Sequence, residues 1–372
     1  MKPVAIQGIG VVGAFGHRLD LLEKALVGCL PVPETICLNM PDGPLSVDVL
    51  RADVSAIERV VGKNTMRRLD RYSRMAVLAA CQAMEDAGGL NGPGPCGDRV
   101  GIIIATGYGP AGSTCAFLKS IQDLDHLFPS PTHFSNSVHN SAAAYISMHL
   151  GITGPALTVS QSEGAVTSAL LTAGLWLAED RVDAVLFGAV DEYADVLAIF
   201  LSQLYQKGGK AELKQNNRQL PIGEGSVFFL LTGGNDSQCG YGHIETIHQP
   251  IISHHPVSPN TLFFISGSED RTHSDALPVG ITEHHPVLSY QTIYGLVPLA
   301  IAFDMAIALL SLKNRKVYMP WTSRSNSTDW RTDNDFSIPK PGSIHCITWS
   351  GHRILEYIHL QNQRCCVLMT VI

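Results

Sequence analysis

Short apolar runs alternate along the chain with longer segments in which apolar residues recur every three or four positions. A short apolar run bounded by glycines is typical of a buried strand, and recurrence at i, i+3 and i+4 is typical of a helix with one buried face. Strands are predicted at residues 4–12, 99–109, 156–159, 182–193, 223–232, 242–249 and 261–268. Helices are predicted at residues 67–89, 141–151, 165–180 and 293–315. This alternation predicts an α/β protein with a largely parallel sheet that helices cover on both faces.

The chain is long enough for one large domain or for two fused halves. Its 372 residues are 45% hydrophobic and 16% charged, so it can bury a large core. A polar stretch at residues 233–239 separates the predicted elements into two groups. We therefore expect a first half at residues 1–238 and a shortened second half at residues 239–372.

Charge and cysteine content exclude several classes of function. The formal net charge is −7 and the lysines and arginines are scattered, which argues against a nucleic-acid partner. The apolar start of the chain is too short to span a bilayer and lacks a small-residue cleavage site, so we expect a cytoplasmic protein with no membrane partner. The nine cysteines show no C-x-x-C spacing, which indicates neither a disulfide framework nor a zinc site.

Residues 154–164, GPALTVSQSEG, lead from a strand through a turn of small polar residues into the predicted helix at 165–180. Such a strand–turn–helix can present a nucleophile at a helix N-terminus, where the pKa of a thiol is lowered. The residue at the tip of this turn is Glu163, and a carboxylate cannot form an acyl thioester. Ser162 lacks the glycine two positions earlier that a serine-hydrolase elbow requires, so we interpret it as a turn residue.

Two other patterns are weak. Gly8, Gly10 and Gly13 match the spacing of a dinucleotide fingerprint, but the helix that should follow at once is absent. Histidines cluster at residues 243–248, 254–255 and 284–285 without the fixed spacing of a known ligand set. We therefore expect a tight turn after the first strand, solvated histidines, and neither a cofactor nor a bound metal.

Several segments resemble, in the same order, those of β-ketoacyl synthases of the thiolase fold. They are the opening strand and loop at 4–16, the helix at 67–88, the strand at 100–109, the elbow at 154–164 and PIGEGSVFFLL at 221–231. The resemblance implies a thiolase fold with a duplicated αβαβα layered architecture. The two halves expected above would then be ketosynthase-like.

The resemblance also identifies the positions at which an active ketosynthase has its catalytic residues. The elbow cysteine is replaced by Glu163, the first histidine by Ser266, the lysine by Gln291 and the second histidine by Leu296. Serine is a weak neutral donor and leucine has no proton to give, so neither replaces an imidazole that stabilises developing negative charge. The pattern predicts a protein that keeps the fold and has lost the chemistry.

Inactive subunits of this kind resemble the chain length factors of type II polyketide synthases, and residues 131–159 are most similar to those of aryl polyene pathways. The resemblance implies a heterodimer with an active ketosynthase, joined near the helices at 141–151 and 165–180. In such a pair the chain would shape the tunnel in which malonyl units, carried on acyl carrier protein, are condensed with loss of carbon dioxide.

Three questions stay open at this level. The chain could instead be a non-catalytic homodimer that binds an acyl chain or a carrier protein. It could be an enzyme with unorthodox chemistry at Glu163. The Glu163 carboxylate could accept backbone N–H groups at the helix N-terminus, or reach into the cavity and steer an acyl chain.

Overall fold

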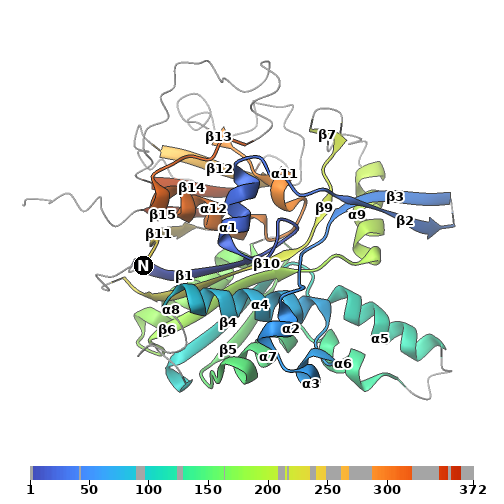
Figure 1. Cartoon of the computed structure of the whole chain (residues 1–372), viewed down its shortest axis with the longest axis horizontal. Helices are drawn as coiled ribbons and strands as arrows, with labels where there is room; N and C mark the ends of the chain where they lie inside the picture. Colours follow the sequence, from blue (N-terminus) through green and yellow to red (C-terminus); the bar gives the residue numbers. More distant parts are fainter. Residues whose placement is uncertain are drawn as a thin grey trace, which may run out of the picture.

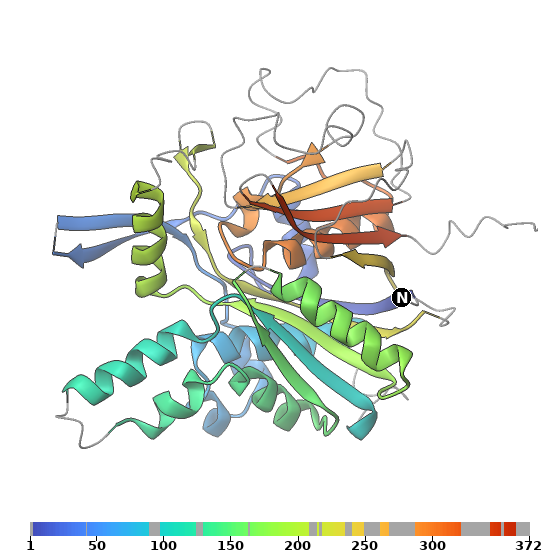
Figure 2. The same cartoon turned by 180° about the vertical axis from the view of Figure 1, so that it is seen from behind.

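The computed structural model describes residues 3–41, 43–88, 97–123, 129–162, 164–207, 214–215, 218–234, 240–248, 261–267, 287–320, 343–350 and 353–361. Ten of its strands form one sheet in the order β13-β12-β14-β15-β11-β1-β10-β6-β4-β5 (Figures 1 and 2). A short antiparallel pairing of β1 with β11, at Val4–Ile6 and Gly242–Ile244, joins its two five-stranded halves.

The first half of the sheet contains β1 (Val4–Val12), β4 (Val100–Thr106), β5 (Ala156–Ser160), β6 (Ala184–Asp191) and β10 (Gly225–Gly233). The second half contains β11 (Gly242–His248), β12 (Thr261–Gly267), β13 (Val287–Leu288), β14 (Ser343–Ser350) and β15 (Arg353–Gln361). If the five strands of each half are numbered in sequence order, their spatial order from the outer edge is third, second, fourth, fifth and first in both halves. Corresponding strands of the two halves also pair in the same parallel or antiparallel sense. The two halves are therefore structural repeats, although no repeat is visible in the amino-acid sequence.

The prediction of a largely parallel sheet is wrong. β4 runs parallel to β5 and β6, and β12 runs parallel to β13 and β14, but the other five pairings in this sheet are antiparallel. The reason is burial on both faces. An antiparallel strand that is covered on both faces has the same continuous apolar sequence as a buried parallel strand, so the pattern does not distinguish the two directions.

Helices cover both faces of the first half. On one face, α4 (Arg71–Asp86) and α7 (Ser141–Leu150) pack against side chains such as Ile102, Ile104 and Leu186. Neighbouring strand residues point the opposite way, toward α8 (Ala165–Ala178) and α12 (Ala300–Asn314). Both of these inner helices contact strands from both halves, so they form a central layer.

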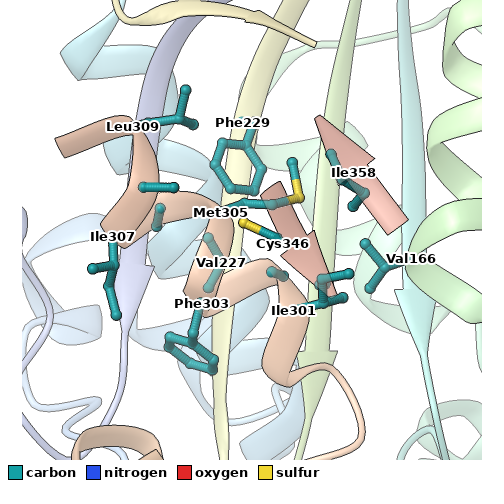
Figure 3. Close-up of a cluster of buried hydrophobic side chains, with 14 of the residues drawn as sticks. Val166, Val227, Phe229, Ile301, Phe303, Met305, Ile307, Leu309, Cys346 and Ile358 are labelled. Atoms are coloured by element: carbon teal, nitrogen blue, oxygen red, sulfur yellow. The ribbon is translucent and has the colours of Figure 1, made fainter. Parts of the chain in front are cut away.

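The largest apolar core lies in this central layer (Figure 3). There Val166 of α8 and Ile301 and Met305 of α12 meet Phe229 of β10 and Cys346 of β14. All five side chains are buried. Because burial of one such side chain contributes about 1.5–3 kcal/mol, this core is the main source of stability that holds the halves together.

The predicted helix at 293–315 is interrupted. The structure has a short helix α11 (Gln291–Tyr294), then a loop, and only then α12 from Ala300. Gly295 adopts a φ of 76°, outside the right-handed helical region, and this ends α11. Pro298 has no backbone N–H, so it cannot donate a hydrogen bond of the kind that a continuous helix requires. The apolar periodicity runs across this break, which is why the sequence pattern predicts a single helix.

The glycines of the apparent dinucleotide fingerprint are packing residues. A Cβ at Gly10 would lie 1.9 Å from the Ala79 carbonyl oxygen of α4, and one at Gly8 would lie 2.3 Å from that of Ala83. The chain turns at residues 13–16, and α1 (Leu19–Leu26) begins only afterwards. The tight turn predicted after the first strand is therefore present.

Two features extend from this body in Figures 1 and 2. One is a hairpin of β2 (Glu34–Met40) and β3 (Gly43–Leu50), with β9 (Ile222–Gly223) paired to β3 and α9 (Asp195–Lys207) nearby. The other is the pair α5 (Ala111–Asp123) and α6 (Pro131–Ser137). Shorter elements are α2 (Ile57–Val60), α3 (Lys63–Met66), β7 (Lys214–Gln215) and β8 (Arg218–Gln219). Among the described helices, none is long and apolar enough to cross a bilayer.

Candidate functional site

The strand–turn–helix expected at residues 154–164 is present. β5 ends at Ser160 and α8 begins at Ala165, and Gly164 between them has a φ of 80° that favours glycine. The Gln161 amide donates to the Thr106 carbonyl oxygen at 3.0 Å, which ties the turn to the end of β4. Glu163 itself lies outside the described residues.

The three other predicted positions lie in the second half, near strand ends. Ser266 is the second-last residue of β12, and its buried Oγ has no hydrogen-bond partner among the described atoms. Gln291 is the first residue of α11 and is buried. β12 and β13 run parallel, and the Phe264 and Tyr290 rings meet 4.9 Å apart just before these two residues. Ser266 and Gln291 therefore lie at the same end of the sheet.

Leu296 lies in the loop between α11 and α12 and is partly buried. Its backbone pairs with the other half of the chain, since its N–H donates to the Pro221 carbonyl at 2.8 Å and its carbonyl accepts from Gly223 at 2.8 Å. Two residues later, Pro298 packs on Gly107, where a Cβ would lie 2.4 Å from the proline Cβ. The loop that contains Leu296 thus lies against the residue that follows β4.

The loop that follows β4, residues 107–110, connects two parts of the candidate site. Thr106 connects this loop to the turn after β5, and Gly107 connects it to Pro298. On its other side, a Cβ at Gly109 would lie 2.5 Å from the His139 ring. Ser266, Gln291 and Leu296 supply a hydroxyl, an amide and an alkyl group. None of these three supplies a thiolate or an imidazole.

Asp191, the last residue of β6, is the centre of this loop's hydrogen bonding, although the sequence analysis did not single it out. Its buried carboxylate accepts from the Thr106 hydroxyl at 2.9 Å and from the backbone N–H groups of Gly107 and Tyr108 at 3.0 Å each. Burial raises the pKa of Asp191 to about 6, although these donors oppose the shift.

Glu192 follows directly and is also buried. Its carboxylate accepts from the Gly112 N–H at 2.7 Å, in the first turn of α5. Burial, and next the negative charge of Asp70, raise the pKa of Glu192 to about 8, while the Gly112 bond opposes the shift. Near neutral pH this side chain is therefore mostly protonated.

A third buried carboxylate, Glu224, lies in the GEG turn before β10. It forms an ion pair with Arg71 and accepts from the backbone N–H groups of Ala52 at 2.9 Å and Tyr193 at 3.0 Å. The Arg71 Nε lies 2.9 Å and 3.0 Å from the two carboxylate oxygens. Burial lowers the pKa of Arg71, but the hydrogen bonds and charge of Glu224 outweigh it and raise the value.

The histidine clusters form no metal centre in the part of the chain that the structure describes. His243 and His248 lie on β11, whereas residues 254–255 and 284–285 lie outside the described residues.

Part of the chain is similar in sequence to known β-ketoacyl synthases. The family "Beta-ketoacyl synthase, N-terminal domain" matches residues 46–203. A putative polyketide beta-ketoacyl synthase 1 of Streptomyces virginiae is 24% identical over 244 residues, which cover 62% of this chain and 58% of that protein. The 3-oxoacyl-[acyl-carrier-protein] synthase 2 of Staphylococcus aureus (strain N315) is 28% identical over 157 residues, which cover 41% of this chain and 37% of the relative. The chain thus matches between about a third and three fifths of the length of these relatives.

Solved structures match almost the whole chain. A β-ketoacyl synthase from Burkholderia phymatum STM815 superposes with a TM-score of 0.70 at 16% identity, over 97% of this chain and 100% of that one. The ishigamide ketosynthase/chain length factor gives a TM-score of 0.69 at 13% identity, over 97% and 99%. These matches confirm the predicted thiolase-like fold. The sequence matches show similarity to β-ketoacyl synthases over part of the chain, including the match to their N-terminal domain at residues 46–203.

Proposed function

We propose that this chain is a catalytically silent subunit of the chain length factor type that works with an active ketosynthase. The proposal is supported by the ketosynthase-like fold, taken together with the sequence resemblance that aligns Glu163, Ser266, Gln291 and Leu296 with the catalytic positions of active ketosynthases. Serine is a weak neutral donor and leucine has no proton to give, so neither replaces the imidazole of an active ketosynthase.

In the proposed complex, the partner ketosynthase supplies the cysteine and both histidines. A malonyl unit on acyl carrier protein loses carbon dioxide, and its carbanion attacks the acyl thioester on the partner's cysteine. This chain would line part of the tunnel that receives the product. Its structural neighbours include a type II PKS acyl-carrier protein in complex with its ketosynthase, at 14% identity and a TM-score of 0.68, which supports the proposal. The proposal also includes membership of the aryl polyene subfamily, which the resemblance of residues 131–159 suggests.

The outer edge of the first half supports a protein partner. β5 is the edge strand and pairs with β4 alone among the described strands, so its other side has unpaired backbone groups. Both α7 and α8 contact β5. Large apolar side chains are exposed on these elements, with Met148 70% and Leu175 52% exposed beside Leu157 and Leu171. A free strand edge next to exposed apolar side chains is typical of a surface that another protein covers.

Co-expression with the ketosynthase of its own gene cluster tests the proposal. We expect a one-to-one complex by size-exclusion chromatography with light scattering, and condensation of malonyl units by that complex but not by this chain alone. A stable homodimer that ignores the ketosynthase would instead support the non-catalytic acyl-chain or carrier-protein binding protein. Condensation by the isolated chain would show that it has chemistry of its own.

A further inference from the structure

Three carboxylates hold the segment between β4 and α5 by its backbone and hydroxyl groups. Asp191 accepts from the Thr106 hydroxyl and from two successive backbone N–H groups, and Glu192 accepts from the Gly112 N–H. Asp70, the N-cap of α4, accepts from the Ser113 hydroxyl at 2.7 Å. Residues 106–113 are therefore held by acidic side chains at the C-terminal end of β6 and at the N-cap of α4.

This segment contacts the turn after β5, the loop that contains Leu296 and the ring of His139. Thr106 accepts from the Gln161 amide in the turn before α8, Gly107 packs on Pro298, and Gly109 packs on His139. Where the loop lies therefore determines how the turn after β5 and the loop with Leu296 sit relative to each other.

The charges around this segment are unbalanced. The charged groups that act on the Glu192 carboxyl are the carboxyls of Asp70 and Glu224 and the guanidinium of Arg71. Arg71 is already paired with Glu224 through two of its nitrogens. If Glu192, Asp70 and Glu224 were all ionised, three negative charges would lie near one positive charge, and burial of Glu192 and Glu224 makes this unfavourable.

We propose that Asp191 and Glu192 are positioning residues that hold the segment 106–112 at the candidate site, with Glu192 acting as a proton-dependent latch. Asp191 fixes the loop by accepting several donors at once. Glu192 holds the start of α5 while protonated, and its ionisation favours opening of the segment to water, where the charge is solvated. The inference concerns this chain alone and does not depend on the proposed function.

The sign of the pH effect follows from proton linkage. Burial raises the pKa of Glu192 to about 8, whereas an opened segment returns the carboxyl to an ordinary glutamate value of about 4.3. Between these values the closed segment binds one more proton than the open one, so each pH unit raises the opening constant about tenfold. The Asp191 pKa is about 6, so above pH 6.5 mainly Glu192 contributes.

Amide hydrogen exchange of the purified protein, followed by mass spectrometry between pH 6.5 and 9, measures the opening constant. For the amides of residues 107–109 and 111–112, corrected for intrinsic exchange, we expect the opening constant to rise nearly tenfold per pH unit up to about pH 7.5 and to reach a plateau above about pH 8. Glu192→Gln keeps an acceptor oxygen but cannot ionise, so its profile should be flat. Asp183→Asn is the matched control, because Asp183 lies just before β6 and pairs with Arg99 at the exposed surface; it should behave as the native chain.

Two outcomes would overturn the role proposed for Glu192. One is a native profile without pH dependence, and the other is the same slope in Glu192→Gln. Asp191→Leu removes both carboxylate oxygens, so the opening constant of amides 107–109 should rise at every pH. Asp191→Asn keeps one acceptor oxygen and should raise that constant less. If Asp191→Leu does not fold, Asp191→Asn carries this part of the test. Exchange in Asp191→Asn equal to that in Asp183→Asn would exclude a positioning role for Asp191.

Discussion

The Glu224 carboxylate joins four segments of the first half. It binds Arg71 at the start of α4, the amide of Ala52 after β3 and the amide of Tyr193 after β6, and it precedes β10 itself. The Glu224 side chain is completely buried, while that of Arg71 is 29% exposed. Its truncation therefore tests whether one buried acid holds the framework of the site.

The size of the effect can be worked from these contacts. Removing one partner of a buried ion pair costs about 3–5 kcal/mol, because the remaining charge is left uncompensated. Each of the two backbone donors that loses its acceptor adds about 1–3 kcal/mol where water cannot replace the carboxylate. Arg71 keeps some contact with water, which lowers the first contribution. We expect Glu224→Ala to lower the free energy of unfolding by about 4–8 kcal/mol, a large share of the 5–15 kcal/mol typical of a folded domain.

Glu34→Ala is the matched control. Glu34 also pairs with an arginine, with 2.7 Å between the Arg51 Nε and its carboxylate, but both side chains lie at the surface. An exposed pair contributes about 0.2–1 kcal/mol, so this variant should unfold almost like the native chain. Glu224→Gln, which keeps one acceptor and loses the charge, should fall between the two.

Urea unfolding followed by tryptophan fluorescence, at one fixed protein concentration, compares the three variants. A Glu224→Ala variant within about 1 kcal/mol of Glu34→Ala would refute the reasoning. It would mean that water enters the cluster and replaces the carboxylate.

Three further results are expected. Glu163→Cys should not condense malonyl units, because a thiol without the two imidazoles leaves the carbonyl unpolarised; elongation by this variant in an acyl carrier protein assay would contradict the site assignment. Leu157→Asp should weaken pairing with the ketosynthase in pull-downs, whereas Val32→Asp, also at the surface, should not; equal pairing would move the interface away from β5. Gly10→Ala should lower the melting temperature, since its Cβ would overlap a backbone oxygen of α4, and Gly62→Ala, with open space around it, should not.

Much of the first half follows from its sequence pattern. The predicted strand at 4–12 is β1, and the predicted helix at 165–180 is α8 with its end shifted by two residues. The turn between β5 and α8 was also predicted, because a glycine and small polar residues follow an apolar run. Long uninterrupted periodicity is the most dependable signal in a sequence.

The remaining features depend on contacts that no local pattern encodes. The predicted strand direction was wrong because strands buried on both faces have the same apolar pattern in either direction. The break before α12 was missed because apolar residues continue through it. Asp191 and Glu192 were missed as site residues for a related reason. Asp191 and the hydroxyl it binds are 85 positions apart, and its other partners are backbone amides, which carry no signal in the sequence.

The central claim is that this chain takes part in condensation without being acylated. Its most direct test is intact-mass spectrometry of the complex with its ketosynthase after incubation with acyl carrier protein bearing an acyl thioester. The account predicts an acyl adduct on the ketosynthase and none on this chain. An adduct on this chain, with or without the ketosynthase present, would contradict it.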